Sequence, residues 1–344
     1  MKTVKVGLIG LGAISRAHIR NLKATPEARI SAICDIRPEM LKEKKAMIEE
    51  DSKYRVRTYS DYREMLDETS LDAVQIITPH DVHYEQAKEV LGRGLHCLVE
   101  KPLTNALSHS LELVQMAKKK NVALVVSYDQ NYTSAYLYAK EIISSGKLGE
   151  VMGFTGELTQ NWIRIMNPER QTDRFRFAWR SDPRIAGGGF LNDSGSHLQA
   201  AILWLTGLIP KEALAFVDNC GTKTDINIDA SLRCSLPSGQ ADVSGTLAFH
   251  GNVPNFSVEF TIWGSKGNLY IRNWKVWHLK SRKCLIRPRT TLPPPSNPDR
   301  NLIDAILGRD EVKCDGTLGA KVVALTRAVY ASAKKGTPAR ASAV

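Results

Sequence analysis

Short apolar runs alternate with amphipathic stretches along the first third of the chain. The apolar runs fall at residues 5–10, 30–35, 73–78, 96–100 and 123–128. The stretches between them, among them residues 83–94 and 109–120, carry apolar side chains three and four positions apart, as helices do. Strands that are apolar throughout and joined by helices are typical of a parallel sheet covered on both faces. We therefore predict a doubly wound α/β domain over residues 1–125.

The pattern changes after residue 128. A helical stretch and an apolar strand come first, and from about residue 211 apolar and polar positions alternate with a period of two, broken by tight glycine turns such as "GSKGN". This alternation predicts antiparallel hairpins. The helical period returns at residues 301–309 and 319–336. For residues 126–344 we predict an α+β domain with an open, mainly antiparallel sheet.

Composition adds modest limits to this picture. A length of 344 residues fits two domains. No apolar window is long enough to span a membrane, and the N-terminus leads directly into a strand pattern, so we expect neither a membrane partner nor a signal peptide. The six cysteines form no CxxC pair, which favours reduced thiols and a cytoplasmic location.

The formal net charge of +11 leaves nucleic acid, an anionic ligand or no particular partner open. The densest basic segment, residues 280–289, lacks interleaved aromatic residues and precedes a proline-rich stretch. We interpret it as a solvated loop and expect no nucleic-acid partner. The charge is compatible with a phosphate-bearing cofactor.

A glycine motif follows the first predicted strand. Gly10, Gly12 and Ser15 form a G-x-G-x-x-S version of the dinucleotide fingerprint. Gly10 allows the tight turn, Gly12 lets the backbone approach a pyrophosphate, and the third position must be small. The pyrophosphate would sit at the start of the next helix, beside Ala13 and Ile14, where free N–H groups favour anions. An ordinary strand–helix turn is the alternative.

An acidic residue at the end of the second strand supports dinucleotide binding. Asp35 lies 25 positions after Gly10 (35 − 10), near the place expected for a ribose-binding carboxylate. A carboxylate there would repel a 2′-phosphate, which favours NAD. Arg37 could instead reach such a phosphate, so NADP is the alternative cofactor.

Two opposite charges end the strand at residues 96–100. Glu100 and Lys101 precede Pro102, at the carboxyl end of a strand where ligands of open α/β sheets bind. A lysine there can hold a substrate oxygen or take part in proton transfer. An exposed Glu–Lys pair is the alternative.

A second motif lies at residues 187–197. Three glycines, Gly187 to Gly189, allow close backbone approach or positive φ. Asp193 and His197 follow, four apart, at the start of an apolar helix, and this spacing places both on one face. His197, kept neutral by the helix dipole, could accept a proton while Asp193 orients it or the substrate. The alternative is that Asp193 caps the helix and His197 is a satisfied edge residue.

Together these stretches resemble the glucose-fructose oxidoreductase / inositol dehydrogenase / rhizopine-catabolism (Gfo/Idh/MocA) family along most of the chain. The matching motifs are "GLIGLGAISRAH", "ITPHDVHYEQA", "EKPLT", "SSGKLGEV", "WRSDP", "AGGG", "DSGSH" and the two helical stretches near the C-terminus. The motif "ITPHDVHYEQA" adds Thr78, Pro79 and His83 to the expected cofactor-binding residues, beside Glu100 and Lys101.

The resemblance implies a Rossmann domain followed by an α+β domain whose open sheet often mediates homo-oligomers, as dimers or tetramers. It implies an enzyme that transfers hydride between NAD or NADP and a secondary alcohol or ketone of a sugar, polyol or sugar derivative. Lys101, Asp193 and His197 match the family's catalytic set. In the implied mechanism His197 takes the hydroxyl proton and Lys101 holds the same oxygen, often with unusual geometry at the Lys-Pro peptide.

Substrate contacts are expected from Lys101, Asp193 and His197 and from three further residues, Asn131, Trp162 and Arg164. Many sugar and inositol dehydrogenases of the family carry a further aspartate three residues after the histidine, where this chain has Ala200. This departure argues against recognition of the myo-inositol type. If Arg164 and Arg180 face the pocket, an acidic or nucleotide-linked sugar is favoured.

Two other functions fit the same fold. A member that uses bound NAD for redox-assisted glycoside hydrolysis would retain its cofactor and form no net NADH. A non-catalytic dinucleotide sensor would have lost the lysine, which is present here as Lys101. No metal ligand set is expected.

Overall fold

The computed structural model describes the chain except residues 1, 51–53, 167–177, 282–283, 287–291 and 343–344. It divides into two compact units. The first comprises Met1–Thr104, Ser108–Ser127 and Asn297–Thr317, and the second comprises Asn105–Leu107, Tyr128–Ser296 and Leu318–Val344. The chain therefore returns to the first unit after building most of the second.

A parallel six-stranded sheet forms the centre of the first unit, in the order β3-β2-β1-β4-β5-β6. This is a doubly wound order, and the alternating pattern predicts a sheet of that class. Strand β3 is short and exposed, so the sequence has no apolar run at its position. The strands are β1 (Val4–Ile9), β2 (Ala28–Cys34), β3 (Arg57–Tyr59), β4 (Ala73–Ile76), β5 (His96–Val99) and β6 (Leu124–Val126).

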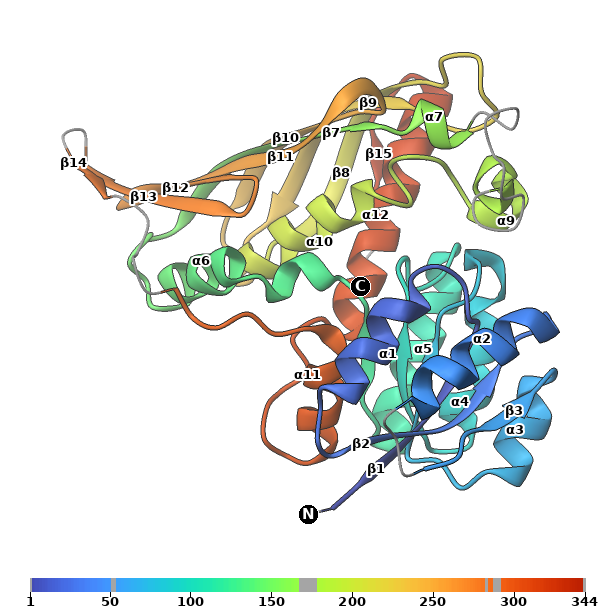
Figure 1. Ribbon diagram of the computed structural model, residues 1–344. Coiled ribbons are helices and arrows are strands. Elements are labelled where there is room, and N and C mark those ends of the chain that lie inside the picture. Colours follow the sequence, from blue (N-terminus) through green and yellow to red (C-terminus); the bar gives the residue numbers. More distant parts are fainter. Residues whose placement is uncertain (1, 51–53, 167–177, 282–283, 287–291, 343–344) are drawn as a thin grey trace. The chain divides into compact units, whose positions relative to one another are not determined.

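Helices of the first unit surround this sheet (Figure 1). Each buries one apolar stripe; α1, for example, buries Ile19 and Leu22 and leaves basic residues in its last turn. The helices are α1 (Ser15–Lys23), α2 (Pro38–Glu49), α3 (Tyr62–Glu68), η1 (His80–Val82), α4 (His83–Gly92), α5 (Leu107–Lys120) and α11 (Pro298–Ile306).

Helix α11 belongs to the core of the first unit although about 170 residues of the second unit precede it (128–296). Its Leu302 and Ile303 are fully buried in one apolar cluster with strand residues such as Val6 and Leu8. In Figure 1 α11 lies beside α1, and the two helices are in contact. Burial of these apolar side chains holds the returning segment against the sheet.

A nine-stranded sheet forms the second unit, in the order β14-β13-β12-β11-β7-β10-β9-β8-β15. All neighbouring pairs are antiparallel except β10 with β7, which is parallel. Both predictions of fold class are thus confirmed. The strands are β7 (Val151–Asn161), β8 (Ile209–Asp218), β9 (Asn227–Ser235), β10 (Asp242–His250), β11 (Asn252–Gly264), β12 (Gly267–Arg272), β13 (Lys275–Ser281), β14 (Cys284–Ile286) and β15 (Ala339–Arg340).

Helices cover one face of this sheet, with α6 and α10 side by side along it in Figure 1. An added Cβ on Gly156 of β7 would meet Leu198 and Ile202 of α10 within 3.3 Å, so helix and strand approach closely there. The helices of this unit are η2 (Asp129–Tyr132), α6 (Ser134–Ser144), α7 (Ile163–Met166), η4 (Ala178–Ser181), α9 (Pro183–Ala186), α10 (Gly195–Thr206) and α12 (Gly316–Lys335).

The basic segment at 280–289 differs from the expected loop. Lys280 and Ser281 end β13 and residues 284–286 form β14, while 282–283 and 287–289 lie outside the described residues. Residues 284–286 pair with β13 through their backbone, so this part of the segment is a strand and not the predicted loop. Among the described residues, no helix is long and apolar enough to cross a bilayer.

Candidate functional site

The glycine loop has the geometry that a dinucleotide needs. Gly10 has φ +88°, and an added Cβ would lie 2.6 Å from the carbonyl oxygen of Ile77. At Gly12 an added Cβ would meet nothing within 4 Å, so the backbone there is open. Ser15 is buried, and its hydroxyl donates to the Gly12 carbonyl at 2.7 Å. The small third position thus joins the loop to helix α1.

Helix α1 begins without a side-chain cap and has no acidic residue in its first turn. Its first N–H groups and the positive end of its dipole can therefore take an anion beside Gly12, Ala13 and Ile14. The residues present fit the pyrophosphate of a dinucleotide on these observations.

Asp35 lies directly behind the loop. Its buried carboxylate accepts a hydrogen bond from the Leu11 N–H at 2.7 Å and another from the Arg37 N–H at 2.9 Å. The Arg37 guanidinium also donates to it, at 3.1 Å. The carboxylate therefore ties the end of β2 to the loop, and it holds Arg37 in an ion pair.

Thr78, Pro79 and His83 link two loops at the carboxyl edge. His83 is fully buried, with one ring nitrogen 2.9 Å from the Thr78 carbonyl and the other 2.9 Å from the Pro102 carbonyl. Burial lowers the pKa of His83, so the ring is neutral and donates to one carbonyl at a time. The Thr78 hydroxyl donates to Gln86 at 2.7 Å. His83 therefore holds the end of β4 near the segment that carries Lys101.

Glu100, the acidic member of the charged pair after β5, has a side chain that is only 12% exposed. One of its oxygens lies 3.0 Å from the His18 Nε2, and the other accepts from the Lys101 N–H at 3.2 Å. Burial raises the pKa of Glu100, but the His18 hydrogen bond and charge and the Lys101 charge outweigh burial and lower the pKa to about 2. Glu100 is thus an anion, and the Lys101–Pro102 peptide beside it is cis. The alternative of an exposed surface pair does not fit the low exposure of the Glu100 side chain.

Close neighbours explain the three glycines at 187–189. Gly187 has φ +72°, and an added Cβ on Gly189 would lie 2.3 Å from the Asp225 carbonyl oxygen. The Asp225 carboxylate accepts from the N–H groups of Gly189 at 2.6 Å and Leu191 at 2.8 Å, and from the Tyr330 hydroxyl at 2.6 Å. Asp225 therefore anchors the loop that leads to Asp193. No local motif in the sequence singled out Asp225.

Arg180 is the partner of Asp193. The Arg180 Nε donates to the buried Asp193 carboxylate at 2.7 Å. Asp193 precedes helix α10, whose N-cap is Ser194, so the alternative of an Asp193 cap does not hold. A charge-assisted hydrogen bond from an arginine fixes the direction of a nearly buried carboxylate.

His197 lies in the first turn of α10 and faces Asp129. Its Nδ1 is 3.4 Å from an Asp129 oxygen, and its ring meets the Tyr128 ring edge-on, with the centroids 6.0 Å apart. A carboxylate this close to the ring stabilises the positive charge that His197 would carry after taking up a proton. The segment "DQNY" was expected to line the pocket through Asn131, and Asp129 was not singled out.

The three further substrate residues differ in position. Asn131 is buried in η2, and Arg164 is exposed on α7. Trp162 is only 3% exposed and packs against Phe190, with the ring centroids 5.5 Å apart. Trp162 thus has little surface for a ligand, as expected of a core residue. The roles of all three in substrate binding stay predictions.

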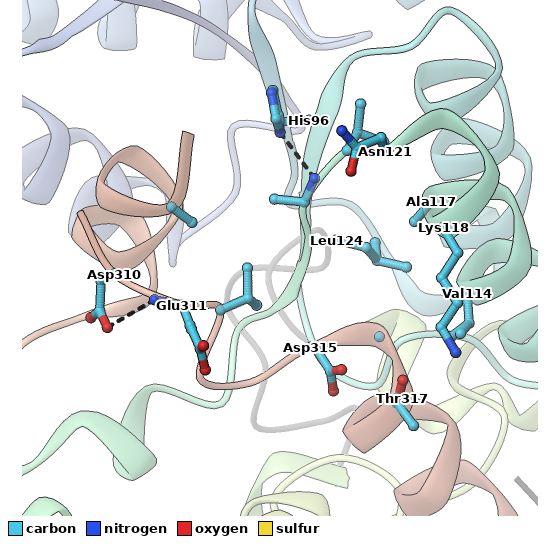
Figure 2. Close-up of a pocket in the computed structure, with 15 residues that line it drawn as sticks. His96, Val114, Ala117, Lys118, Asn121, Leu124, Asp310, Glu311, Asp315 and Thr317 are labelled. Atoms are coloured by element: carbon cyan, nitrogen blue, oxygen red, sulfur yellow. Dashed lines mark hydrogen bonds between the residues drawn. The ribbon is translucent and has the colours of Figure 1, made fainter. Parts of the chain in front are cut away.

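A pocket of about 600 Å³ lies elsewhere on the first unit, at the amino ends of β5 and β6. Figure 2 shows Asp310, Glu311 and Asp315 on one side of it and Lys118 and Asn121 on the helix side. Ligands of doubly wound sheets bind at the carboxyl ends of the strands, which is the opposite edge. This pocket is therefore separate from the glycine loop. In the described part of the chain no group of three metal-binding side chains occurs.

The fold and both motifs place the chain in a known class of NAD-binding oxidoreductases. A model described as "Oxidoreductase family, NAD-binding Rossmann fold" matches residues 4–128, and the GFO/IDH/MocA C-terminal domain matches residues 136–270. The chain belongs to the Gfo/Idh/MocA family, and the resemblance predicted from its motifs is confirmed.

Among curated relatives, the levoglucosan dehydrogenase of Pseudarthrobacter phenanthrenivorans is 28% identical over 215 residues, which is 60% of this chain and 52% of the relative. The chain spans about half the length of the curated relatives it matches. A solved levoglucosan dehydrogenase in complex with NADH is 22% identical, with a TM-score of 0.84 and full coverage of both chains. The WlbA dehydrogenase of Bordetella pertussis, in complex with NADH and UDP-GlcNAcA, is 24% identical, with a TM-score of 0.79 over 98% of this chain and 99% of that one.

Proposed function

We propose that this chain is an NAD-dependent dehydrogenase that acts on a secondary alcohol or ketone of a sugar, polyol or sugar derivative. The position of Lys101 carries the proposal. It follows β5 at the same edge of the parallel sheet as the glycine loop that follows β1, and its N–H donates to the carboxylate of Glu100. The names of the relatives, dehydrogenases of sugars and sugar derivatives, support the substrate class.

Each motif has a distinct chemical task in this proposal. NAD, when bound, accepts the hydride from the carbinol carbon. The Lys101 ammonium donates a hydrogen bond to the substrate oxygen and stabilises the negative charge that develops on it. The His197 imidazole accepts the hydroxyl proton at Nε2, and the Asp129 carboxylate beside Nδ1 compensates the positive charge that results. Asp193, fixed by Arg180, is placed to accept from a substrate hydroxyl.

The Asp35 carboxylate supports NAD over NADP. Its oxygens already accept from Leu11 and Arg37, so the anion is fixed behind the glycine loop. A 2′-phosphate would meet this fixed negative charge, while ribose hydroxyls would find an acceptor. The ion pair with Arg37 offsets part of that charge without removing the acceptor.

The proposal is tested by following nicotinamide absorbance with purified protein. NAD or NADP is mixed with a panel of sugars, anhydrosugars, polyols, inositols, sugar acids and nucleotide-linked sugars. Turnover is expected with NAD and one of these classes, because Lys101 and His197 supply the donor and the acceptor that the reaction needs. The reverse reaction with NADH and the matching ketones is run beside it.

The same preparations distinguish the other functions. Absence of turnover across the panel, together with NAD that stays bound through purification and release of sugar from a chromogenic glycoside, would replace the dehydrogenase by a redox-assisted hydrolase. Absence of any turnover with weak, reversible NAD binding would favour a sensor.

We infer that the chain forms homo-oligomers through the open face of its large sheet. Leu214, Phe216 and Trp263 are exposed at 41%, 77% and 40%. Leu214 and Trp263 line one shallow pocket of about 530 Å³ together with polar strand residues such as Arg233 and Thr246. Apolar side chains gathered on one sheet face are typical of a protein interface. A second copy of the chain is the partner proposed.

Replacing Phe216 by aspartate is expected to dissociate this oligomer, because a charge would be buried without a partner. Sedimentation velocity measures the change, with Met152→Asp as a control for an apolar-to-acid change at another exposed position, 63% exposed at the start of β7. A monomeric wild type, or equal effects of both variants, would contradict the proposed interface.

A cytoplasmic location is part of the proposal. Cys34, Cys97, Cys220 and Cys234 are free thiols, as proteins of the reducing cytoplasm usually keep them.

A further inference from the structure

Three charged side chains from distant parts of the sequence form one chain inside the first unit. The His18 Nδ1 lies 2.7 Å from an Asp299 oxygen, and its Nε2 lies 3.0 Å from a Glu100 oxygen. His18 is on α1, Glu100 follows β5, and Asp299 is on the returning helix α11, 281 positions from His18. His18 and Asp299 are both buried.

The partners of His18 fix its protonation state. Ionised carboxylates can only accept hydrogen bonds, so both ring nitrogens must donate, and a ring that donates twice is an imidazolium. Asp299 accepts further hydrogen bonds from the side-chain amides of Asn21 at 2.7 Å and Gln75 at 2.9 Å. Burial acts to lower the pKa of His18, but Asp299 and Glu100 outweigh it and raise the pKa to about 10.

We propose that His18, held as an imidazolium between Asp299 and Glu100, is a positioning residue for Lys101. Glu100 accepts from the Lys101 N–H with the oxygen that does not contact His18, so the imidazolium sets the place of the carboxylate and the carboxylate sets the backbone at Lys101. Helix α1 also starts at the glycine loop. The His18 imidazolium thus connects three parts of the first unit: helix α1, which starts at the glycine loop, the segment of Glu100 and Lys101, and helix α11. The inference rests on the proposed function for its link to catalysis.

The charged groups around His18 are those that a positioning role for Lys101 requires. The charged ones are Asp299 from α11 and Glu100 from the end of β5, and Lys101 lies beyond Glu100. With a neutral ring, one of the two carboxylates would lose its hydrogen bond from His18, and both would lose the positive charge between them. The carboxylate of Glu100 would then shift or take up a proton, and Lys101 would move with it.

The first test is a titration of the histidine ring signals by NMR, with wild-type protein and Asp299→Asn, and with His18→Gln used to assign the signal. In the wild type the His18 signal is expected to stay that of an imidazolium up to about pH 9, whereas free histidine titrates near pH 6.5. In Asp299→Asn it is expected to titrate within that range. Asp304→Asn is the matched control, because Asp304 lies on the same helix and pairs with Arg300 and Arg309 instead.

The second test is the pH dependence of turnover. Asp299→Asn is expected to lower kcat roughly 10- to 100-fold, since a small displacement of a catalytic group has effects of this size. The Michaelis constant for NAD should change little. The loss should also deepen as pH rises and the ring becomes neutral, a dependence that the wild type and Asp304→Asn lack.

If Asp299→Asn does not fold, the wild type alone tests the network. A folded-state pKa above the unfolded value stabilises the fold fully below pH 6.5, and this contribution is lost as pH rises through about 10. The free energy of unfolding should therefore fall over this window in the wild type. A His18 signal that titrates near pH 6.5 would overturn the proposal.

Failure of the proposed function is recognised separately. If no substrate is turned over, the NMR signal of Lys101, labelled at Cε and assigned with Lys101→Met, replaces the kinetic readout. A shift of this signal in Asp299→Asn but not in Asp304→Asn supports positioning. An Asp299→Asn variant that lowers only the melting temperature, with the Lys101 signal and pH profile of the wild type, would reduce the network to a structural role.

Discussion

Replacing Lys101 by methionine is expected to lower kcat/KM by about 100-fold or more. Methionine has a similar length but neither charge nor donor, so the substrate oxygen loses the group that stabilises its developing charge. NADH binding, measured by fluorescence, should change little, because the glycine loop and Asp35 are untouched. The melting temperature should also stay near that of the wild type, since the ammonium is not part of the apolar core.

Two variants make this result specific. Lys120→Met removes an exposed lysine at the end of α5 and should keep full activity. Lys101→Arg keeps the charge but changes the shape of the donor, and it should recover only part of the rate because a guanidinium does not substitute for a compact ammonium. Equal activity of Lys101→Met and the wild type would remove Lys101 from the mechanism.

The two glycines of the cofactor loop are expected to respond in opposite ways to alanine. In Gly10→Ala the new Cβ would lie 2.6 Å from the Ile77 carbonyl oxygen, and the residue would keep φ near +88°. Strain at such a backbone conformation costs about 1–3 kcal/mol, and the contact with the neighbouring strand end adds to it. The melting temperature should fall by on the order of 10 °C. Thermal unfolding followed by circular dichroism measures this.

Gly12→Ala is the matched control for stability and the test for binding. Its Cβ meets nothing within 4 Å, so the melting temperature should stay within about 1 °C of the wild type. The same Cβ would stand where the backbone must approach a pyrophosphate, so the dissociation constant for NADH should rise by about 10-fold or more. Unchanged NADH affinity in Gly12→Ala would place the dinucleotide elsewhere.

The local pattern was sufficient for the N-terminal fold and its cofactor loop. Short apolar runs marked β1, β2, β4, β5 and β6, because buried parallel strands must be apolar on both faces. Strand β3 (Arg57–Tyr59) was not predicted, because it is exposed and only three residues long. The positions of Gly10, Asp35 and Lys101 at strand ends followed directly from the same pattern.

For the second unit, the sequence predicted the fold class but not the way its strands pair. Period-two alternation indicated its strands, and the Gly264–Gly267 turn between β11 and β12 lies where "GSKGN" predicted a hairpin. The parallel pairing of β10 with β7 carries no local signal, since residue alternation is the same for either direction.

Among the charged residues, the sequence alone determined which ones stand at strand ends and helix starts, and so named Lys101, Asp193 and His197. Only the tertiary structure decided their partners: Arg180 for Asp193, Asp129 for His197, and the His18 and Asp299 pair behind Glu100. The physical reason is that the period of buried positions can be recognised from neighbouring residues. A charge pair between α1 and α11 depends instead on how the returning segment packs against the sheet, and no single stretch of the sequence encodes that packing.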